Sequence, residues 1–208
     1  MKNNQQKELE ALLAKVRNCH ECADHLPYSP RPVLTADVNS PILIIGQAPG
    51  RRVQKSGIPW DDPSGDRLRT WMGVDSTTFY DKSLISIIPM GFCYPGTGKS
   101  GDLPPRPECA KLWHSTLMTM LTSLKLTLLV GNYAQRHYLA EDRKKATLTK
   151  TVANWKKYCP KYLPLPHPSP RNNLWLRRNP WFVDEVVPYL RQRVNLVLAN
   201  ADLNENFL

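Results

Sequence analysis

Long apolar segments are missing from this chain of 208 residues. The first ten residues are polar and include no stretch of the length that a signal peptide needs. No later run approaches the ~20 apolar residues of a membrane-spanning helix. We therefore expect a cytoplasmic protein that does not contact a membrane. Cysteine is also sparse, with five residues in the chain. An odd number of cysteines without an export signal argues against a disulfide framework.

Acidic residues are few. The chain has 18 Asp and Glu against 28 Lys and Arg, so its net charge of +10 favours an anionic partner. Residues 143–178 contain ten Lys or Arg and no Asp or Glu, interleaved with Trp155, Tyr158, Tyr162 and Trp175. Cations that reach phosphates, mixed with aromatics that stack on bases, are typical of a nucleic-acid surface. A solvated basic face over core aromatics explains the stretch equally well.

The pattern of apolar residues predicts a mixed fold. Four short runs predict strands at 42–45, 84–88, 126–130 and 162–165. Helical patterns lie between and around them, at 5–17, 66–72, 108–121, 133–139, 150–158 and 181–198, the last with a kink at Pro188. This alternation predicts an α/β three-layer sandwich around a central, mainly parallel four-stranded sheet. We expect a single domain over 1–208, with an N-terminal helix and C-x2-C segment at 5–22 and a polar, frayed tail at 200–208.

Two short motifs follow predicted strands. Gly46-Gln47-Ala48-Pro49-Gly50 follows the first run, and His167-Pro168-Ser169 follows the fourth. A glycine-flanked loop lets a ligand approach the backbone, and ligands of open parallel sheets bind beyond the carboxyl ends of the strands. The two motifs therefore predict one binding site at that edge of the sheet.

These motifs resemble the two active-site motifs of the uracil-DNA glycosylase superfamily. The likeness is closest to its iron–sulfur branch, called family 4, and spans residues 19–181. It implies a monofunctional DNA repair glycosylase of base excision, a hydrolase that flips a damaged base, first of all uracil, and cleaves its N-glycosidic bond. We expect a monomer that acts on damaged DNA. The alternative is a non-catalytic nucleic-acid-binding protein with a glycosylase fold.

The resemblance also implies residue roles. His167 would donate a hydrogen bond to the departing base, and Trp60, in Gly57-Ile58-Pro59-Trp60, would stack on it. The other expected substrate contacts are Gly46, Ala48, Pro49, Gly50, Asn132 and Ser169. The residues alone also allow a structural explanation for each of these. His167 would make a loop contact, Trp60 would lie in the core, and Asn132 would cap a helix.

The chain departs from family 4 at two positions. Gln47 stands where that family has a glutamate, and an amide can hold a water but cannot accept its proton at neutral pH. We therefore expect Asp61, Asp62 or Asp66 to supply the carboxylate, and favour Asp61 and Asp62 because they directly follow Trp60. A turn and a helix start would explain these residues equally well. Pro89 stands where family 4 has the asparagine that reads uracil, so another damaged base is an open alternative.

The residues after His-Pro-Ser are the expected DNA contacts, because the superfamily grips the strand around the flipped nucleotide there. They are Arg171, Asn172, Asn173, Arg177 and Arg178.

Four cysteines form a candidate metal site. Cys19 and Cys22 make a C-x2-C pair, and Cys93 and Cys109 follow at C-x15-C. Four thiolates suit either a [4Fe-4S] cluster or zinc, and the resemblance favours the cluster. Buried cysteines without any metal are the third possibility, and Cys159 is expected to be structural.

Overall fold

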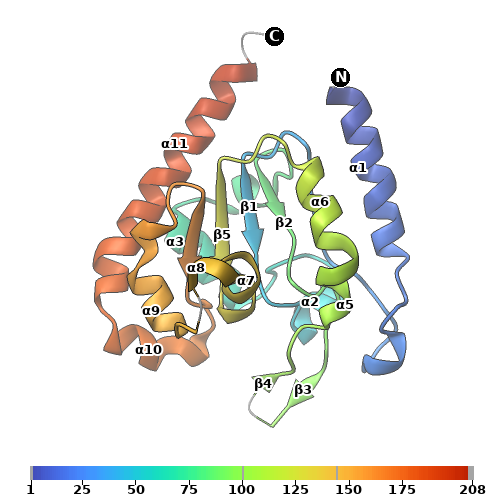
Figure 1. Ribbon diagram of the computed structural model, residues 1–208, viewed down its shortest axis with the longest axis horizontal. Coiled ribbons are helices and arrows are strands. Elements are labelled where there is room, and N and C mark those ends of the chain that lie inside the picture. The colour runs from blue at the N-terminus through green and yellow to red at the C-terminus, as the bar shows by residue number, and fades with distance from the viewer. Residues whose placement is uncertain (1, 100, 144, 206–208) are drawn as a thin grey trace.

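A four-stranded parallel sheet forms the centre of the fold in a computed structural model that describes residues 2–99, 101–143 and 145–205. Its strand order is β2-β1-β5-β6 and every neighbouring pair is parallel (Figure 1). The strands are β1 (Ile42–Ile45), β2 (Ile85–Ile87), β5 (Leu126–Val130) and β6 (Tyr162–Leu165). The predicted α/β class and parallel sheet are confirmed, and β2 is one residue shorter at each end than its apolar run.

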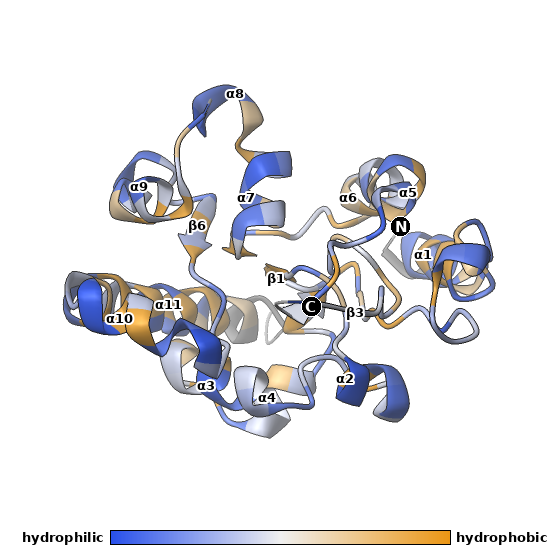
Figure 2. Cartoon of the chain, turned by 90° about the horizontal axis from the view of Figure 1, so that it is seen from below, coloured by the Kyte–Doolittle hydropathy of each residue, from blue (hydrophilic) through white to orange (hydrophobic). Residues whose placement is uncertain are grey.

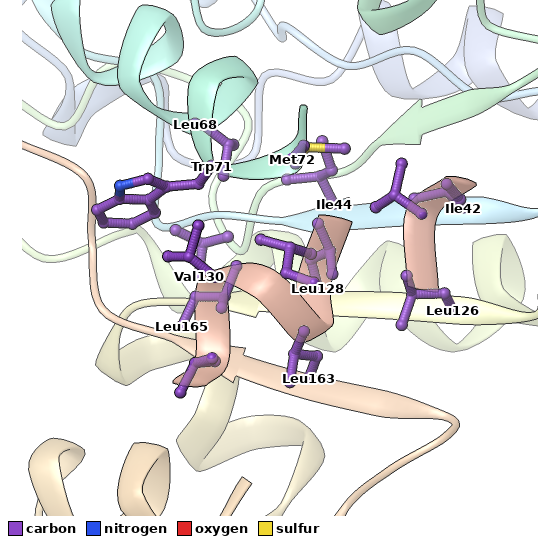
Figure 3. Close-up of a cluster of buried hydrophobic side chains, with 14 of the residues drawn as sticks. Ile42, Ile44, Leu68, Trp71, Met72, Leu126, Leu128, Val130, Leu163 and Leu165 are labelled. Carbon is purple, nitrogen blue, oxygen red and sulfur yellow. The ribbon is translucent and has the colours of Figure 1, made fainter. Parts of the chain in front are cut away.

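Both faces of the sheet are buried, which explains why the strands are apolar at nearly every position. Ile42 and Ile44 point to one face, where they pack with Leu68 and Met72 (Figure 3). Leu43 points to the other face and packs in a second cluster.

Helices cover these two faces in separate layers (Figure 2). The helices are α1 (Lys2–Arg17), α2 (Arg51–Ser56), α3 (Pro63–Met72), α4 (Ser76–Tyr80), α5 (Pro107–Cys109), α6 (Ser115–Met120), α7 (Asn132–Tyr138), α8 (Ala140–Arg143), α9 (Leu148–Ala153), α10 (Asn173–Arg178) and α11 (Val187–Glu205). Helices α3, α4 and α11 supply the first cluster, and α1, α6 and α7 supply the second. Within the described ranges, no helix is long and apolar enough to cross a bilayer.

Several helices differ from the predicted ones. The predicted helix 108–121 is interrupted by a π-helical turn, Ala110–His114, and the predicted helix 150–158 ends early in a 3-10 turn, Trp155–Lys157. The irregularity expected at Pro188 lies just before it, as a π-helical turn at Phe182–Val186. Helix α11 extends into the predicted polar tail as far as Glu205, since it meets no glycine or proline that would end it, and residues 206–208 of that tail lie outside the described residues.

A small hairpin, β3 (Thr97–Gly98) and β4 (Gly101–Asp102), was not predicted. It projects beyond the carboxyl ends of the central strands (Figure 1). At this edge β1 leads to β2 on one side, while β5 leads to β6 on the other, so the crevice for a ligand lies between β1 and β5.

Candidate functional site

One pocket at the carboxyl ends of the strands brings the two sequence motifs together. Gln47 and its neighbours come from the loop after β1, and His167 comes from the loop after β6. The pocket is also lined by Trp60, Asp62 and Pro89. The cavity has a volume of about 40 Å³. This is much less than the roughly 150 Å³ of an apolar protein cavity that holds benzene, so it accommodates waters but not a nucleobase.

His167 is held in one tautomer. The backbone N–H of Ser169 donates to its Nδ1 at 3.2 Å, so Nδ1 must be an unprotonated acceptor and the neutral ring carries its proton on Nε2. Burial lowers the pKa of His167, and the charge of Asp62 works in the opposite direction. The carbonyl oxygen of His167 accepts from Nδ2 of Asn172 at 2.7 Å. The imidazole is thus a positioned, neutral hydrogen-bond donor.

Trp60 lies between the two motifs. Its ring centroid is 5.5 Å from that of His167, with 31° between the planes. A Cβ atom placed on Gly46 would stand 2.9 Å from Cζ2 of Trp60, so the indole lies directly on that glycine. Trp60 also has a φ of 57°, a left-handed conformation that is strained for an aromatic residue and is often found at functional sites.

The two candidate carboxylates differ in position. Asp62 lines the pocket, and its Oδ1 accepts from the N–H of Gly65 at 2.9 Å as the N-cap of α3. Asp61 lies outside the pocket lining, with its carboxylate 3.9 Å from Nη2 of Arg52. The geometry therefore places Asp62, rather than Asp61, where it could act on a bound base or water.

A further carboxylate was missed by sequence reasoning. Oδ2 of Asp102, in β4, stands 3.6 Å from the point that a Cβ on Gly50 would occupy, and Oδ2 of Asp62 stands 4.0 Å from it. Burial raises the pKa of Asp102, while Arg171 and Arg51 lower it. No sequence signal could have found Asp102, because only the hairpin brings it to the pocket mouth.

Gln47 faces the same hairpin. Its Nε2 donates to the carbonyl oxygen of Leu103 at 3.5 Å, a weak bond that leaves the amide oxygen available to the pocket.

Pro89 occupies the pocket wall and offers no side-chain donor. Its carbonyl oxygen accepts from Nε2 of His114 at 3.0 Å, and Nδ1 of His114 accepts from the hydroxyl of Tyr138 at 2.7 Å. Burial lowers the pKa of His114 to about 4, so this ring is neutral at pH 7. His114 therefore fixes the pocket wall from behind, a role that sequence reasoning also missed.

Asn132 does not line the pocket. It is the first residue of α7, and its Oδ1 accepts from Nη2 of Arg143 at 2.7 Å. The expected substrate contact by Asn132 therefore has no support in this geometry, since its carboxamide is engaged elsewhere.

The expected DNA contacts lie on the turn after His167 and on α10. Arg171, Asn173, Arg177 and Arg178 are exposed at the same edge of the sheet as the pocket. Asn172 is partly buried, and its amide holds the His167 loop.

The aromatic residues of the basic stretch do not form the stacking surface that its composition suggested. Trp155 and Tyr158 are buried in the two core clusters. Trp175 packs against Trp181 and Phe182, and its Nε1 donates to Thr149 at 2.8 Å. Here the structure supports the solvated basic face over core aromatics.

The four candidate metal ligands lie in one neighbourhood. Cys22, Cys93 and Cys109 are buried and Cys19 is partly buried, and none forms a disulfide. Burial raises the pKa of Cys93 to about 11 and of Cys109 to about 12, and the charges of Cys19 and Cys22 add to both shifts. In the described part of the chain, no three His, Cys, Asp or Glu side chains are arranged to hold an ion. Four thiols are donor groups that suit a metal, but the described side chains do not converge on one point.

The sequence model of the Uracil DNA glycosylase superfamily matches residues 32–191. The chain belongs to this superfamily. The matched region includes both motifs of the pocket and leaves out Cys19 and Cys22. A structure search also matched a solution NMR structure from Methanosarcina acetivorans that is provisionally named a uracil DNA glycosylase. That comparison has 18% sequence identity and a TM-score of 0.43, and it covers 78% of this chain and 98% of the other.

Proposed function

We propose that this member of the uracil DNA glycosylase superfamily is a monofunctional DNA glycosylase that hydrolyses the N-glycosidic bond of a flipped damaged base, with uracil as the first candidate. The observation that carries the proposal is the pocket in which the neutral imidazole of His167 and the Gln47 loop face one another. The departing base gains negative charge, and an Nε2–H donor aimed at it stabilises that charge. One such donor typically contributes about 3 kcal/mol to the transition state.

The carboxylate and amide of the pocket have different tasks. Asp62 stabilises the positive charge that develops on the sugar, orients the attacking water and accepts the proton that this water loses, while the amide of Gln47 holds the water without accepting its proton. The released base anion takes up a proton from solvent. No lysine lines the pocket among the described residues. A covalent imine with the abasic sugar is therefore not part of the proposed mechanism.

Admission of a base requires Trp60 to move. Its indole occupies the space beside Gly46, and the remaining 40 Å³ is too small for a pyrimidine. We propose that the ring swings away from Gly46 and then stacks on the flipped base.

Release of the damaged base distinguishes the proposed glycosylase from a non-catalytic nucleic-acid-binding protein. Purified protein is incubated with single- and double-stranded oligonucleotides that carry uracil, hypoxanthine or xanthine, and abasic sites are then cleaved with alkali. Cleavage of at least one substrate, lost in Asp62→Asn but kept in Asp61→Asn, supports the enzyme and its carboxylate. Binding without cleavage of any substrate supports a non-catalytic nucleic-acid-binding protein, which Gln47 and the small cavity favour.

We further propose that Cys19, Cys22, Cys93 and Cys109 hold a [4Fe-4S] cluster, with zinc as the alternative. When bound, such a cluster would supply structural support by tying the segment after α1 to the loop around Cys93, and no catalytic step passes through it. Protein purified without oxygen should contain iron and labile sulfide. Zinc in their place would support the alternative, and colourless protein without any of these would overturn the metal site.

A further inference from the structure

A second groove lies beside the pocket, between residues 28–31 and α2. Its basic side chains are Arg31, Arg51, Arg52 and Lys55, and no carboxylate lines it among the described residues. The residues of α2 are mostly hydrophilic, as the blue colour of this helix shows (Figure 2). The charge of the groove therefore favours an anionic occupant.

An exposed aromatic ring stands in this groove on a rigid support. Tyr28 is 52% exposed, and its ring lies 6.1 Å from that of Tyr94 with 24° between the planes. Tyr94 is only 3% exposed, its N–H donates to Oε1 of Gln54 at 3.1 Å, and its hydroxyl shares a hydrogen bond with Thr97. One face of Tyr28 is thus covered by a fixed ring, and the exposed side chain can extend the stack by one more planar group.

The walls of the groove are held together. Nη1 of Arg31 donates to the carbonyl oxygen of Gln54 at 2.9 Å, and its Nη2 donates to that of Ser56 at 3.2 Å. This guanidinium joins the Tyr28 segment to the end of α2. Arg52 and Lys55 remain exposed on α2. Among the described residues, the side chain of Arg52 has a single ion-pair partner, Asp61 at 3.9 Å, which is a weak surface pair.

The groove and the pocket lie on different sides of α2. Gly50 and Val53 line the pocket, whereas Arg51, Arg52 and Lys55 line the groove. A strand whose flipped nucleotide enters the pocket would therefore pass over the groove with the nucleotides next to it.

We propose that this groove binds the single-stranded flank of the DNA substrate, with one unpaired base stacked on Tyr28 and its phosphates on Arg52 and Lys55. A paired base keeps its faces against its neighbours in the duplex, so only an unpaired base can stack in this way. The location next to a substrate pocket rests on the proposed function, but the binding itself does not.

Fluorescence anisotropy of an unmodified, labelled single-stranded oligodeoxynucleotide tests the groove. Tyr28→Ala should raise the Kd about 5- to 150-fold, which corresponds to the loss of one stacked base, while Tyr28→Phe should bind like the wild type. The same Tyr28→Ala variant should change the affinity for blunt duplex DNA far less. The double variant Arg52→Ala, Lys55→Ala should reduce the salt slope of log K by about 1.4, since each single-strand phosphate contact contributes about 0.7.

A charge-matched control separates the groove from net charge. Lys7 and Lys125 are exposed away from the groove, and Lys7→Ala, Lys125→Ala removes the same two charges. Circular dichroism melting confirms that each variant is folded. Equal affinity of Tyr28→Ala and the wild type, an equal loss in Tyr28→Phe, or an equal change of salt slope in the control would overturn the groove. Variants that behave as expected in a protein that releases no base would leave the groove standing and refute the glycosylase.

Discussion

Asp62 has two tasks that one pair of substitutions can separate. Its Oδ1 caps α3 through Gly65, and the same residue lines the pocket beside His167. Asparagine is as good an N-cap as aspartate, so Asp62→Asn keeps the cap and removes only the charge. Alanine removes both.

The expected changes in Tm and in the rate of base release follow from these contacts. Loss of an N-cap costs about 1 kcal/mol, which for a chain of this length lowers Tm by roughly 2–4 °C. Asp62→Asn should leave Tm within about 1 °C of the wild type and still lower the single-turnover rate of base release about a hundredfold, since a positioned carboxylate contributes at least that factor. Asp62→Ala should show both losses.

The assay combines thermal unfolding, followed by circular dichroism, with single-turnover release of the base. Asp75 provides the matched control, because its Oδ1 caps α4 through Thr78 at 2.8 Å and does not line the pocket. Asp75→Ala should lower Tm without changing the rate. A wild-type rate in Asp62→Asn would refute the proposed role of this carboxylate, and an equal rate loss in Asp75→Ala would show that the effect comes from stability alone.

Two further predictions concern stability. The pKa of His114 is about 4 in the folded chain and about 6.5 when unfolded, so the unfolded chain binds more protons between these values and stability falls as the pH falls. Urea unfolding of the wild type should show a loss of about 2 kcal/mol from pH 6.5 to 5, and an equal loss in the non-titrating His114→Gln would contradict this assignment. Gly65→Ala should lower Tm severely, because its Cβ would stand 1.8 Å from the carbonyl oxygen of Trp60. Gly50→Ala, whose Cβ meets nothing closer than 3.6 Å, is the control, and equal melting of the two variants would refute the steric argument.

The central sheet was predictable because strands buried on both faces need continuous apolar runs. Residues 42–45, 126–130 and 162–165 match their strands at both ends. Helix details were less predictable. The helix expected from Asp66 begins at Pro63, because Asp62 supplies the cap and proline suits the first helical turn. The π-helical turns have no comparable local signal.

The candidate site was predictable only in part. The motifs containing Gln47 and His167 identified its two walls, since each follows a buried strand. Asp102 and Tyr28 could not be placed, because their positions depend on a short hairpin and on an irregular segment packed against Tyr94. The aromatic residues of the basic stretch were ambiguous in the sequence, since core packing and base stacking favour the same side chains.

Single-turnover release of uracil by the wild type and by His167→Ala tests the account most directly, with DNA affinity measured in parallel. We predict that the wild type releases the base and that the variant does so at least about a hundredfold more slowly, while both bind the oligonucleotide with similar affinity. Equal rates in the two proteins would contradict the assignment of the Nε2–H of His167 as the donor to the departing base.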